Sequence, residues 1–375
     1  MKTLRVLFIN VQCGRGSHGK IAAEQAAKFE HEGHEVRVAY SRDPDMPEKY
    51  RKYAVRIGST ADIYMHALLT RLTDRNGFFS RGATKRFLAW ADEYNPDLLW
   101  LHNIHGYYIN IDMLFRWIKS RPSMRVYWTL HDCWSFTGHC AYFTFAGCEK
   151  WRTHCEHCPQ KNSYPASFVD NSYRNYEDKR RIFTGVKNMT LITPSKWLAD
   201  LAAQSFLREY PCEVRHNEID RNIFRPVTGD FRERYGLSGK KIVLGVANRW
   251  EPRKGIGDFV KLSGILNPEK FVIVLVGLKH DALPENIIHI DRTSNQQELA
   301  EIYSASDVLF NPTYEDNYPT VNLEAEACGT PVVTYDSGGS PETVHREDSR
   351  VVKCGDVETA KKCIEQICKG DDEND

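Results

Sequence analysis

The sequence predicts an α/β protein of two domains, each built around a parallel β-sheet. With 375 residues, the chain is too long for one ordinary domain. Short apolar segments alternate with helical patterns in two successive series, as expected for strands that helices bury on both faces. A polar, charged stretch at 226–240 lies between the two series, and we expect it to connect the domains.

Composition excludes several classes of protein. Lys plus Arg and Asp plus Glu number 50 each, so no net field favours a nucleic acid partner. The apolar run at residues 6–9 is too short for a signal sequence, and Phe271–Leu278 is far shorter than the roughly 20 residues that cross a bilayer. We therefore expect a cytoplasmic protein, with peripheral contact at the inner face of the membrane as an option. The eleven cysteines are then expected to be reduced or metal-bound.

The first domain, predicted at 1–222, begins with a βαβ unit. A strand at Leu4–Val11 leads through a glycine-rich turn into a helix at about 20–32, and Glu35–Tyr40 is the second strand. Further strands of this domain are predicted at Leu98–His102, Val126–His131 and Thr190–Thr193.

The second domain, predicted at 223–375, repeats the pattern. Its strands are predicted at Ile242–Ala247, Phe271–Val276, Ile287–Ile290, Val308–Asn311 and Pro331–Tyr335. Two such arrays place a ligand cleft at the carboxyl ends of their strands.

The loop with Gly14, Gly16 and Gly19 has several interpretations. It fits a dinucleotide fingerprint, with Arg42 placed for a 2′-phosphate, and it resembles a P-loop in which Ile21 replaces the hydroxyl residue. It also fits a turn that only packs helix against strand, or backbone amides that meet a phosphate-bearing donor near Gly16. The loop alone leaves these alternatives open.

The second domain carries the more specific pattern. Arg249 follows a strand and Lys254 stands five residues later at a helix start, so two cations can clamp a diphosphate, although a basic turn without a ligand is the alternative. Farther on, Pro319 suits the first turn of a helix whose amides can bind phosphate. Glu324 lies one turn inside that helix, where it can accept from ribose hydroxyls, and Asp316 precedes it by eight residues.

On the segments 245–255 and 311–345, the chain resembles the retaining nucleotide-sugar transferases of glycosyltransferase family 4. This resemblance covers nearly the whole chain and implies the GT-B fold, two Rossmann-like domains with parallel sheets facing across a cleft. It implies that Arg249 and Lys254 bind the donor diphosphate, that Glu324 binds the ribose, and that either Glu315 or Asp316 contacts the transferred sugar. The backbone near Tyr318, Pro319, Thr320 and Val321 is implied to bind phosphate.

The resemblance also implies a mechanism and a partner. His131 follows a strand and matches the family's histidine, so His131, Asp316, Arg249 and Lys254 are the candidate catalytic residues, and His102 and His105 are candidates for the acceptor side. The expected reaction moves a hexose to a saccharide acceptor, free or lipid-linked, without a catalytic metal. A UDP-sugar is the default donor and a GDP-sugar the alternative. A nucleotide-sugar epimerase or hydrolase, and an NADP-dependent reductase, are the alternative functions.

A cysteine-rich insertion is predicted at about 133–160. The segment 131–140 resembles transferases that build bacterial surface polysaccharides, including the colanic-acid and capsule type. Cys155 and Cys158 have chelate spacing, so the sequence predicts a structural zinc site. Its ligands would be Cys140, Cys148, Cys155 and Cys158. Unliganded thiols and disulfides are the alternatives.

The segment 63–91 is basic, with interleaved phenylalanines. Its charged residues are Arg71, Arg75, Arg81, Lys85 and Arg86 against Asp74. Such a segment suits a membrane surface that presents a lipid-linked acceptor. An ordinary amphipathic helix pair packed on the sheet is the favoured alternative.

Overall fold

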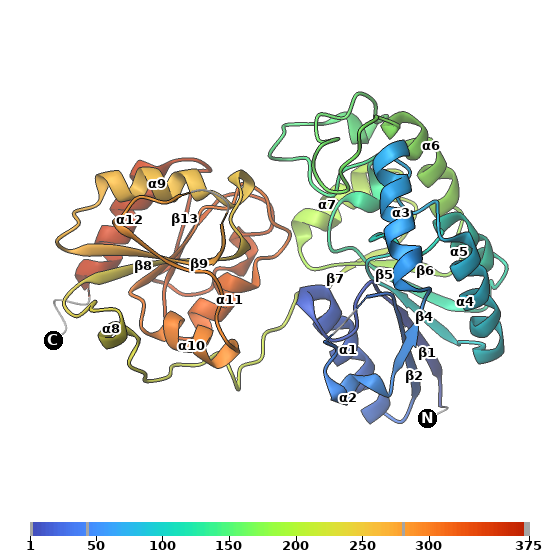
Figure 1. Ribbon diagram of the computed structural model, residues 1–375, viewed down its shortest axis with the longest axis horizontal. Coiled ribbons are helices and arrows are strands. Elements are labelled where there is room, and N and C mark those ends of the chain that lie inside the picture. The colour runs from blue at the N-terminus through green and yellow to red at the C-terminus, as the bar shows by residue number, and fades with distance from the viewer. Residues whose placement is uncertain (1–2, 43–44, 280–281, 371–375) are drawn as a thin grey trace. The chain divides into compact units, whose positions relative to one another are not determined.

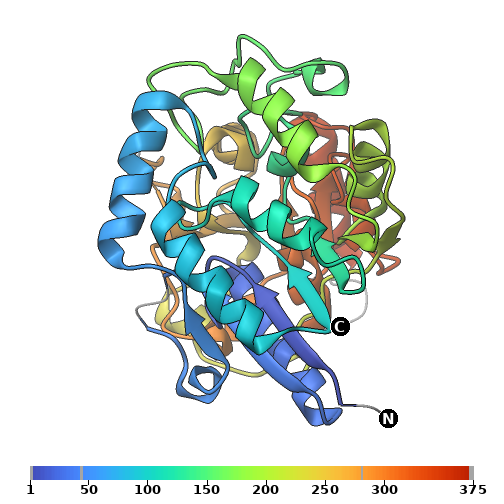
Figure 2. The same cartoon turned by 90° about the vertical axis from the view of Figure 1, so that its right-hand side faces the viewer.

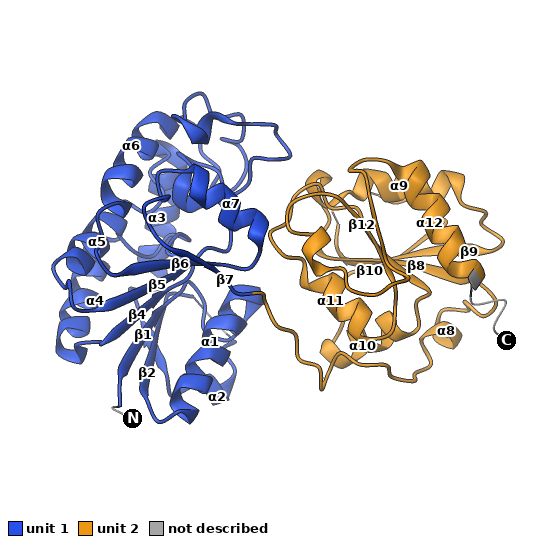
Figure 3. Cartoon of the chain, turned by 180° about the vertical axis from the view of Figure 1, so that it is seen from behind, with its two compact units in different colours: residues 1–215 blue, residues 216–375 orange. Residues whose placement is uncertain are grey.

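The computed structural model describes residues 3–42, 45–279 and 282–370. Contacts divide the chain into two compact units, 1–215 and 216–375 (Figure 3). Unit 1 contains one seven-stranded parallel sheet, and unit 2 contains one six-stranded parallel sheet. The α/β fold class predicted from the sequence is confirmed.

Unit 1 has the strand order β3-β2-β1-β4-β5-β6-β7 (Figure 1). Its strands are β1 (Arg5–Ile9), β2 (Glu35–Tyr40), β3 (Ala54–Arg56), β4 (Leu98–Leu101), β5 (Arg125–Thr129), β6 (Met189–Thr193) and β7 (Cys212–Val214). Its α-helices are α1 (Gly16–His31), α2 (Glu48–Arg51), α3 (Thr60–Thr73), α4 (Arg81–Tyr94), α5 (Ile111–Lys119), α6 (Ser172–Phe183) and α7 (Lys196–Gln204). Two short 3₁₀ helices, η1 (Trp134–Phe136) and η2 (Lys150–Arg152), lie in the cysteine-rich insertion.

Unit 2 has the order β10-β9-β8-β11-β12-β13. Its strands are β8 (Lys241–Arg249), β9 (Phe271–Leu278), β10 (Ile287–Ile290), β11 (Val308–Asn311), β12 (Val332–Tyr335) and β13 (Arg350–Val352). Its helices are α8 (Phe231–Arg234), α9 (Ile256–Ile265), α10 (Gln296–Ser304), α11 (Thr320–Ala327) and α12 (Val357–Gly370), with the 3₁₀ turns η3 (Pro252–Lys254) and η4 (Pro341–Thr343).

Both sheets are buried on both faces. Along β1, Leu7 and Ile9 pack into one apolar cluster while Val6 and Phe8 pack into another, because successive strand residues point to opposite faces. Helices α4 and α5 cover the first cluster, and α1 covers the second. This two-sided burial explains why the strands are continuous apolar runs without polar alternation.

The predicted connecting stretch at 226–240 is instead folded onto unit 2. Phe231 and Leu237 are buried in the same apolar cluster as Ile242 of β8. The charged residues around them obscured these two anchors in the sequence. The contact division falls after Arg215, seven residues before the predicted boundary at 222.

Candidate functional site

Each sheet has a point where the strand order reverses direction. In unit 1 this point lies between β1 and β4, and in unit 2 between β8 and β11. Ligands of open parallel sheets bind outside the carboxyl ends of the strands at such a point. In unit 2 the neighbouring strand ends are Arg249 of β8 and Asn311 of β11, so both predicted donor segments begin there.

The first geometric feature of unit 2 is an ion pair that joins these segments. Lys254 ends η3, and its ammonium donates to the carboxylate of Asp316 in the loop after β11. The neighbouring Arg253 reinforces the junction, since its guanidinium donates to the carbonyl of Glu315 at 2.7 Å and to the carboxylate of Glu251 at 2.8 Å. Two segments that are distant in sequence are thereby held at one edge of the sheet.

The two adjacent acids have different environments. The side chain of Glu315 is fully buried, whereas that of Asp316 retains 23% exposure beside Lys254. Burial raises the pKa of Asp316, but the charge of Lys254 and the hydrogen bond that it donates lower this pKa more, so the net shift is below the ordinary value. Asp316 is therefore an anion at neutral pH.

Two glycines permit this close approach of backbones. Gly255 has a φ of 78°, and a Cβ there would lie 2.2 Å from the carbonyl oxygen of Pro312. Gly338 has a φ of 57°, and a Cβ there would lie 2.1 Å from the carbonyl oxygen of Asp316. Only glycine meets both conditions without strain, so these positions fix the geometry around Lys254 and Asp316.

Glu324 lies on α11, and the structure adds a partner that sequence reasoning missed. The hydroxyl of the buried Tyr303, the residue before the end of α10, donates to Oε2 of Glu324 at 3.0 Å. The helix begins with Pro319 as its N-cap and Thr320 as its first residue, followed by Val321. Within this helix, the side-chain oxygen of Asn322 accepts from the side-chain amide of Asn311 at 2.8 Å, which anchors α11 to β11.

The remaining predicted donor residues lie as follows. Arg249 has an exposed side chain, and its backbone lies opposite Leu278 of β9 in the register of the sheet. The ring of Tyr318 stacks on His216 with centroids 4.8 Å apart. Gly16 belongs to unit 1, where it begins α1 with a φ of 62°.

In unit 1, the carboxyl ends of β1, β4 and β5 gather three histidines. His102 follows β4, and its Nδ1 lies 2.9 Å from Nε2 of His131, just beyond β5. His18, in the first turn of α1, has its ring centroid 5.9 Å from that of His131. Burial lowers the pKa of His102 to about 3 and that of His18 to about 4, and it lowers the pKa of His131 well below the ordinary value. All three rings are therefore neutral at pH 7.

A hydrogen-bonded chain stands beside this cluster. Nε2 of His105 lies 2.9 Å from Oδ2 of Asp132, and its Nδ1 lies 3.0 Å from the hydroxyl of Tyr164. The amide of Trp134 also donates to Asp132 at 2.9 Å. Burial raises the pKa of Asp132, but His105 and the amide outweigh this effect and lower it, so Asp132 is an anion that orients His105. Neither Asp132 nor Tyr164 was predicted; the adjacent His-Asp dipeptide was the available signal.

The four predicted zinc ligands lie around one small hollow in the insertion. However, no group of three or more His, Cys, Asp or Glu residues is arranged to hold a metal ion within residues 3–42, 45–279 and 282–370. The thiols of Cys140 and Cys158 are hydrogen-bonded to each other, and Cys155 accepts from the backbone of Gly138. Burial raises the pKa of Cys155 to about 12, whereas the hydrogen bond with Cys140 lowers the pKa of Cys158 to about 7. The structure therefore gives the predicted zinc site no support.

The alternative of disulfides also finds no support. All eleven cysteines lie among the described residues, and none of them forms a disulfide. The insertion is instead held by its own aromatic core, in which Phe143 lies 4.9 Å from Trp151 and Phe136 lies 5.4 Å from Trp151 between ring centroids.

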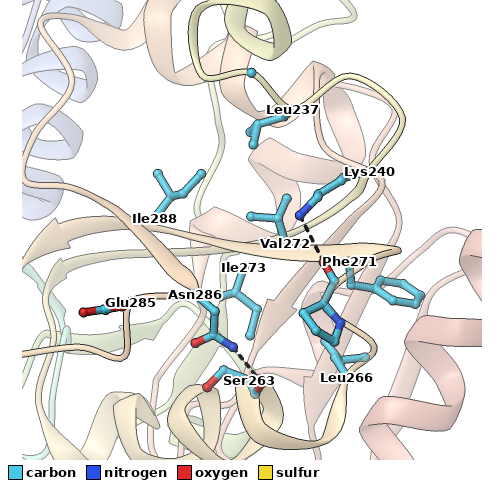
Figure 4. Close-up of a pocket in the computed structure, with 12 residues that line it drawn as sticks. Leu237, Lys240, Ser263, Leu266, Phe271, Val272, Ile273, Glu285, Asn286 and Ile288 are labelled. Carbon is cyan, nitrogen blue, oxygen red and sulfur yellow. Dashed lines mark hydrogen bonds between the residues drawn. The ribbon is translucent and has the colours of Figure 1, made fainter.

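Unit 2 also has a hollow at the end of its sheet opposite to the carboxyl ends of the strands (Figure 4). Its lining includes Phe271 and Ile288, near the amino ends of β9 and β10. The side chains of Lys240 and Asn286 there donate to the backbone carbonyls of Pro268 and Ser263. The hollow is thus remote from the carboxyl strand ends at which parallel sheets bind ligands.

Comparison with known proteins identifies unit 2. Residues 227–375 match the family model described as glycosyl transferases group 1. This part of the chain is therefore similar to the glycosyltransferases that the model describes. The matched part contains every predicted donor residue except Gly16.

In the described part of the chain, no helix combines the length and apolar character that crossing a bilayer requires.

Relatives extend the comparison beyond the matched part of the chain. The chain is 25% identical over 312 residues to the putative colanic acid biosynthesis glycosyl transferase WcaC of Escherichia coli K12. The aligned region covers 80% of this chain and 73% of the relative. It superposes on a glycosyltransferase from Rickettsia africae with a TM-score of 0.69 at 14% identity, over 98% of this chain and 89% of the other. Anabaena HepE in complex with UDP-glucose gives a TM-score of 0.64 at 15% identity, over 98% and 91%. The predicted GT-B fold is confirmed.

Proposed function

We propose that this protein is a retaining glycosyltransferase that moves a hexose from a nucleotide-sugar donor to a saccharide acceptor during surface polysaccharide assembly. The observation that carries this proposal is the ion pair of Lys254 with Asp316, in the part of the chain that matches the glycosyl transferases group 1 model and that also contains Glu324. The relationship to the colanic acid transferase supports the choice of polysaccharide as product.

In the proposed donor complex, Arg249 and Lys254 neutralise the diphosphate, and backbone groups from Tyr318 to Val321 bind its oxygens at the start of α11. Glu324, oriented by Tyr303, accepts from the ribose hydroxyls. Because Glu315 is fully buried, we assign the contact with the transferred sugar to Asp316. A UDP-sugar is the proposed donor, a choice supported by the neighbour that was solved with UDP-glucose.

In the proposed reaction the donor's own phosphate accepts the proton of the attacking acceptor hydroxyl on the face that the phosphate leaves. The bond between the anomeric carbon and the phosphate oxygen breaks as the new glycosidic bond forms, and the anomeric configuration is retained. Lys254 and the amides of α11 stabilise the charge that develops on the departing diphosphate. The protein thus acts by positioning and electrostatics.

The proposed acceptor side is the histidine cluster of unit 1. His131 and His102, both neutral at pH 7, offer hydrogen bonds to sugar hydroxyls and carry no charge. His105 is fixed by Asp132 and extends this polar surface. The acceptor is a saccharide, and the proposal includes a lipid carrier on it, with peripheral membrane contact.

A panel of nucleotide sugars, assayed for hydrolysis and for transfer to saccharides, tests the proposal. One UDP-sugar should be consumed, with a loss of about 10²-fold or more in kcat/KM for Lys254→Ala and Glu324→Gln. Lys270→Ala, which changes an exposed lysine of the same unit, is the matched control and should retain full activity.

The products decide between functions. NMR of the product should show the anomeric configuration of the donor, and an inverted product would contradict the retaining part of the proposal. Release of a free epimerised sugar in place of transfer would indicate an epimerase. Thermal stabilisation by NADP alone, with no response to any nucleotide sugar, would contradict the transferase assignment as a whole.

A further inference from the structure

The outward face of α3 is apolar. Tyr64 is 73% exposed, Met65 56%, Leu68 53% and Leu72 50%. Their spacing of one, four and eight residues places them on one side of a helix. We call these four side chains the α3 apolar face. Figures 1 and 2 show α3 on the outside of unit 1, with no other element of that unit over it.

The opposite side of α3 already fixes the helix in the fold. Ile63, His66 and Thr70 are buried there, and His66 accepts from the amide of Gly77 at 3.1 Å. Its N-terminus is closed by a capping box between Ser59 and Asp62. The helix thus gains its anchorage without Tyr64, Met65, Leu68 or Leu72, so the fold alone does not account for the α3 apolar face.

The apolar surface continues onto the segment after the cysteine-rich insertion. Phe168 is 67% exposed, and its amide donates to the carbonyl of Arg71 at 2.9 Å. The guanidinium of Arg71 lies 5.4 Å from the centre of the Phe168 ring. A cation and a further exposed aromatic ring therefore stand at the C-terminal turn of α3.

Basic side chains lie on α3 itself and on the first turns of α4, the next helix along the chain. Arg71 on α3 and Arg81, Lys85 and Arg86 on α4 are exposed. The bond of 2.8 Å between His66 and Ser80, the N-cap of α4, holds the start of α4 beside the middle of α3.

Of these basic side chains, Arg86 contributes to lowering the pKa of the Asp62 carboxyl on α3, after the hydrogen bonds from Ser59. Within the described part of the chain, no carboxylate lies at ion-pair distance from Arg71, Arg81, Lys85 or Arg86. The nearby Asp74 is buried against His139 instead. Four exposed cations on α3 and the first turns of α4 thus outnumber the one carboxylate, that of Asp62, whose charge interacts with them.

We propose that the α3 apolar face, together with the exposed basic residues of α3 and of the first turns of α4, docks onto the surface of an anionic lipid bilayer. Helices of this kind lie in the interface plane with apolar side chains in the acyl boundary and cations among the headgroups. A second copy of this chain is a poorer occupant, because a symmetric contact would bring the same cations together. The inference adds to the proposed function the surface by which the enzyme would meet a lipid-linked acceptor.

Vesicle flotation of the full chain tests the inference. The wild type should bind vesicles of phosphatidylcholine with phosphatidylglycerol, bind pure phosphatidylcholine weakly, and dissociate as salt is raised. Leu68→Gln combined with Leu72→Gln should lower partitioning by about tenfold or more. Arg81→Gln, Lys85→Gln and Arg86→Gln together should lower it by about 10- to 100-fold.

The control is Val260→Gln with Val351→Gln, which changes two side chains of unit 2 that are 40% and 42% exposed. This variant should bind vesicles as the wild type does. Matching thermal unfolding curves exclude a loss of fold in each variant. Wild-type protein that ignores anionic vesicles, or α3 variants that bind them unchanged, would overturn the inference, as would a dimer abolished by Leu68→Gln with Leu72→Gln.

Activity separates this inference from the proposed function. Hydrolysis of the nucleotide sugar in the absence of vesicles should be unchanged in the α3 variants, because their substitutions lie outside the donor domain. A wild type that binds vesicles but consumes no nucleotide sugar would contradict the proposed function and leave the membrane surface standing.

Discussion

Lys254 and Asp316 form an ion pair across 62 residues of sequence, between the segments that follow β8 and β11. The pair holds a cation and an anion at the switch point of the unit 2 sheet before any donor is bound. A diphosphate that reaches Lys254 therefore meets an ammonium that is already oriented, which lowers the cost of ordering it.

Substitution of this pair should show strong coupling. Asp316→Asn and Lys254→Ala should each lower kcat/KM for the nucleotide sugar by about 10²-fold, and the double variant should lose much less than the product of the two. The coupling arises because each single change leaves the other charge without its partner. Steady-state kinetics of the four proteins measures it, and strictly multiplicative losses would show that the two residues act independently.

Tyr303→Phe should affect donor binding more than turnover. The variant removes the hydroxyl that donates to Glu324 and leaves the ring in its buried position. We expect a loss of about 1 kcal/mol in the free energy of unfolding and a several-fold higher KM for the donor, with kcat nearly unchanged. An unchanged KM would show that Tyr303 does not orient the carboxylate of Glu324 for binding of the ribose.

Gly255→Ala should disrupt the donor segment. With a φ of 78° and a carbonyl oxygen 2.2 Å from the position of the new Cβ, the backbone must shift. We expect a loss of more than about 2 kcal/mol in the free energy of unfolding, together with weaker donor binding.

Gly257→Ala is the matched control, two residues away on α9. No atom lies within 4 Å of its added Cβ, and alanine is the better helix former, so the change should be neutral or stabilising by up to about 1 kcal/mol. Urea unfolding of both variants measures the contrast. Equal effects at the two positions would rule out the steric explanation.

The chain of Tyr164, His105 and Asp132 should matter for the acceptor and not for the donor. Tyr164→Phe and Asp132→Asn should lower the rate of transfer several-fold while donor hydrolysis stays near the wild-type rate. Tyr173→Phe, which removes the hydroxyl of another exposed tyrosine of unit 1, is the control. Parallel loss of hydrolysis and transfer would instead indicate a general structural role.

The buried histidines should make the protein acid-sensitive. His102 has a folded pKa of about 3 against 6.5 for the ordinary group, so below pH 6.5 the unfolded state binds a proton that the folded state refuses. Stability is therefore lost as pH falls from 6.5 towards 3, by about 1.4 kcal/mol per pH unit for each such group. Urea unfolding of the wild type and His102→Gln at pH 7.5, 6 and 5 should show a shallower pH dependence in the variant, and identical slopes would contradict the prediction.

Local patterns were sufficient for most of the fold. Strands such as β8 and β9 are apolar along most of their length because helices cover both faces, so the apolar run itself marks them. The edge strands β3, β7 and β13 were missed, because they have three residues each and only Val352 among their residues is buried. The anchors Phe231 and Leu237 were missed as well, since their charged neighbours made the stretch read as a linker.

The sequence by itself determined where the proposed donor residues stand in their elements, because Arg249, Lys254 and Asp316 lie at or after the ends of strands and Glu324 lies in the first turns of a helix. Such positions are set by contiguous residues. Only the tertiary structure decided which side chains meet. Tyr164 reaches His105 across 59 residues, Tyr303 reaches Glu324 across 21, and the cysteines with metal-like spacing pack as thiols among aromatic rings. The tertiary structure also decided that the α3 apolar face is exposed. Amphipathic periodicity indicates which residues share a side of a helix, but only packing decides which side is covered.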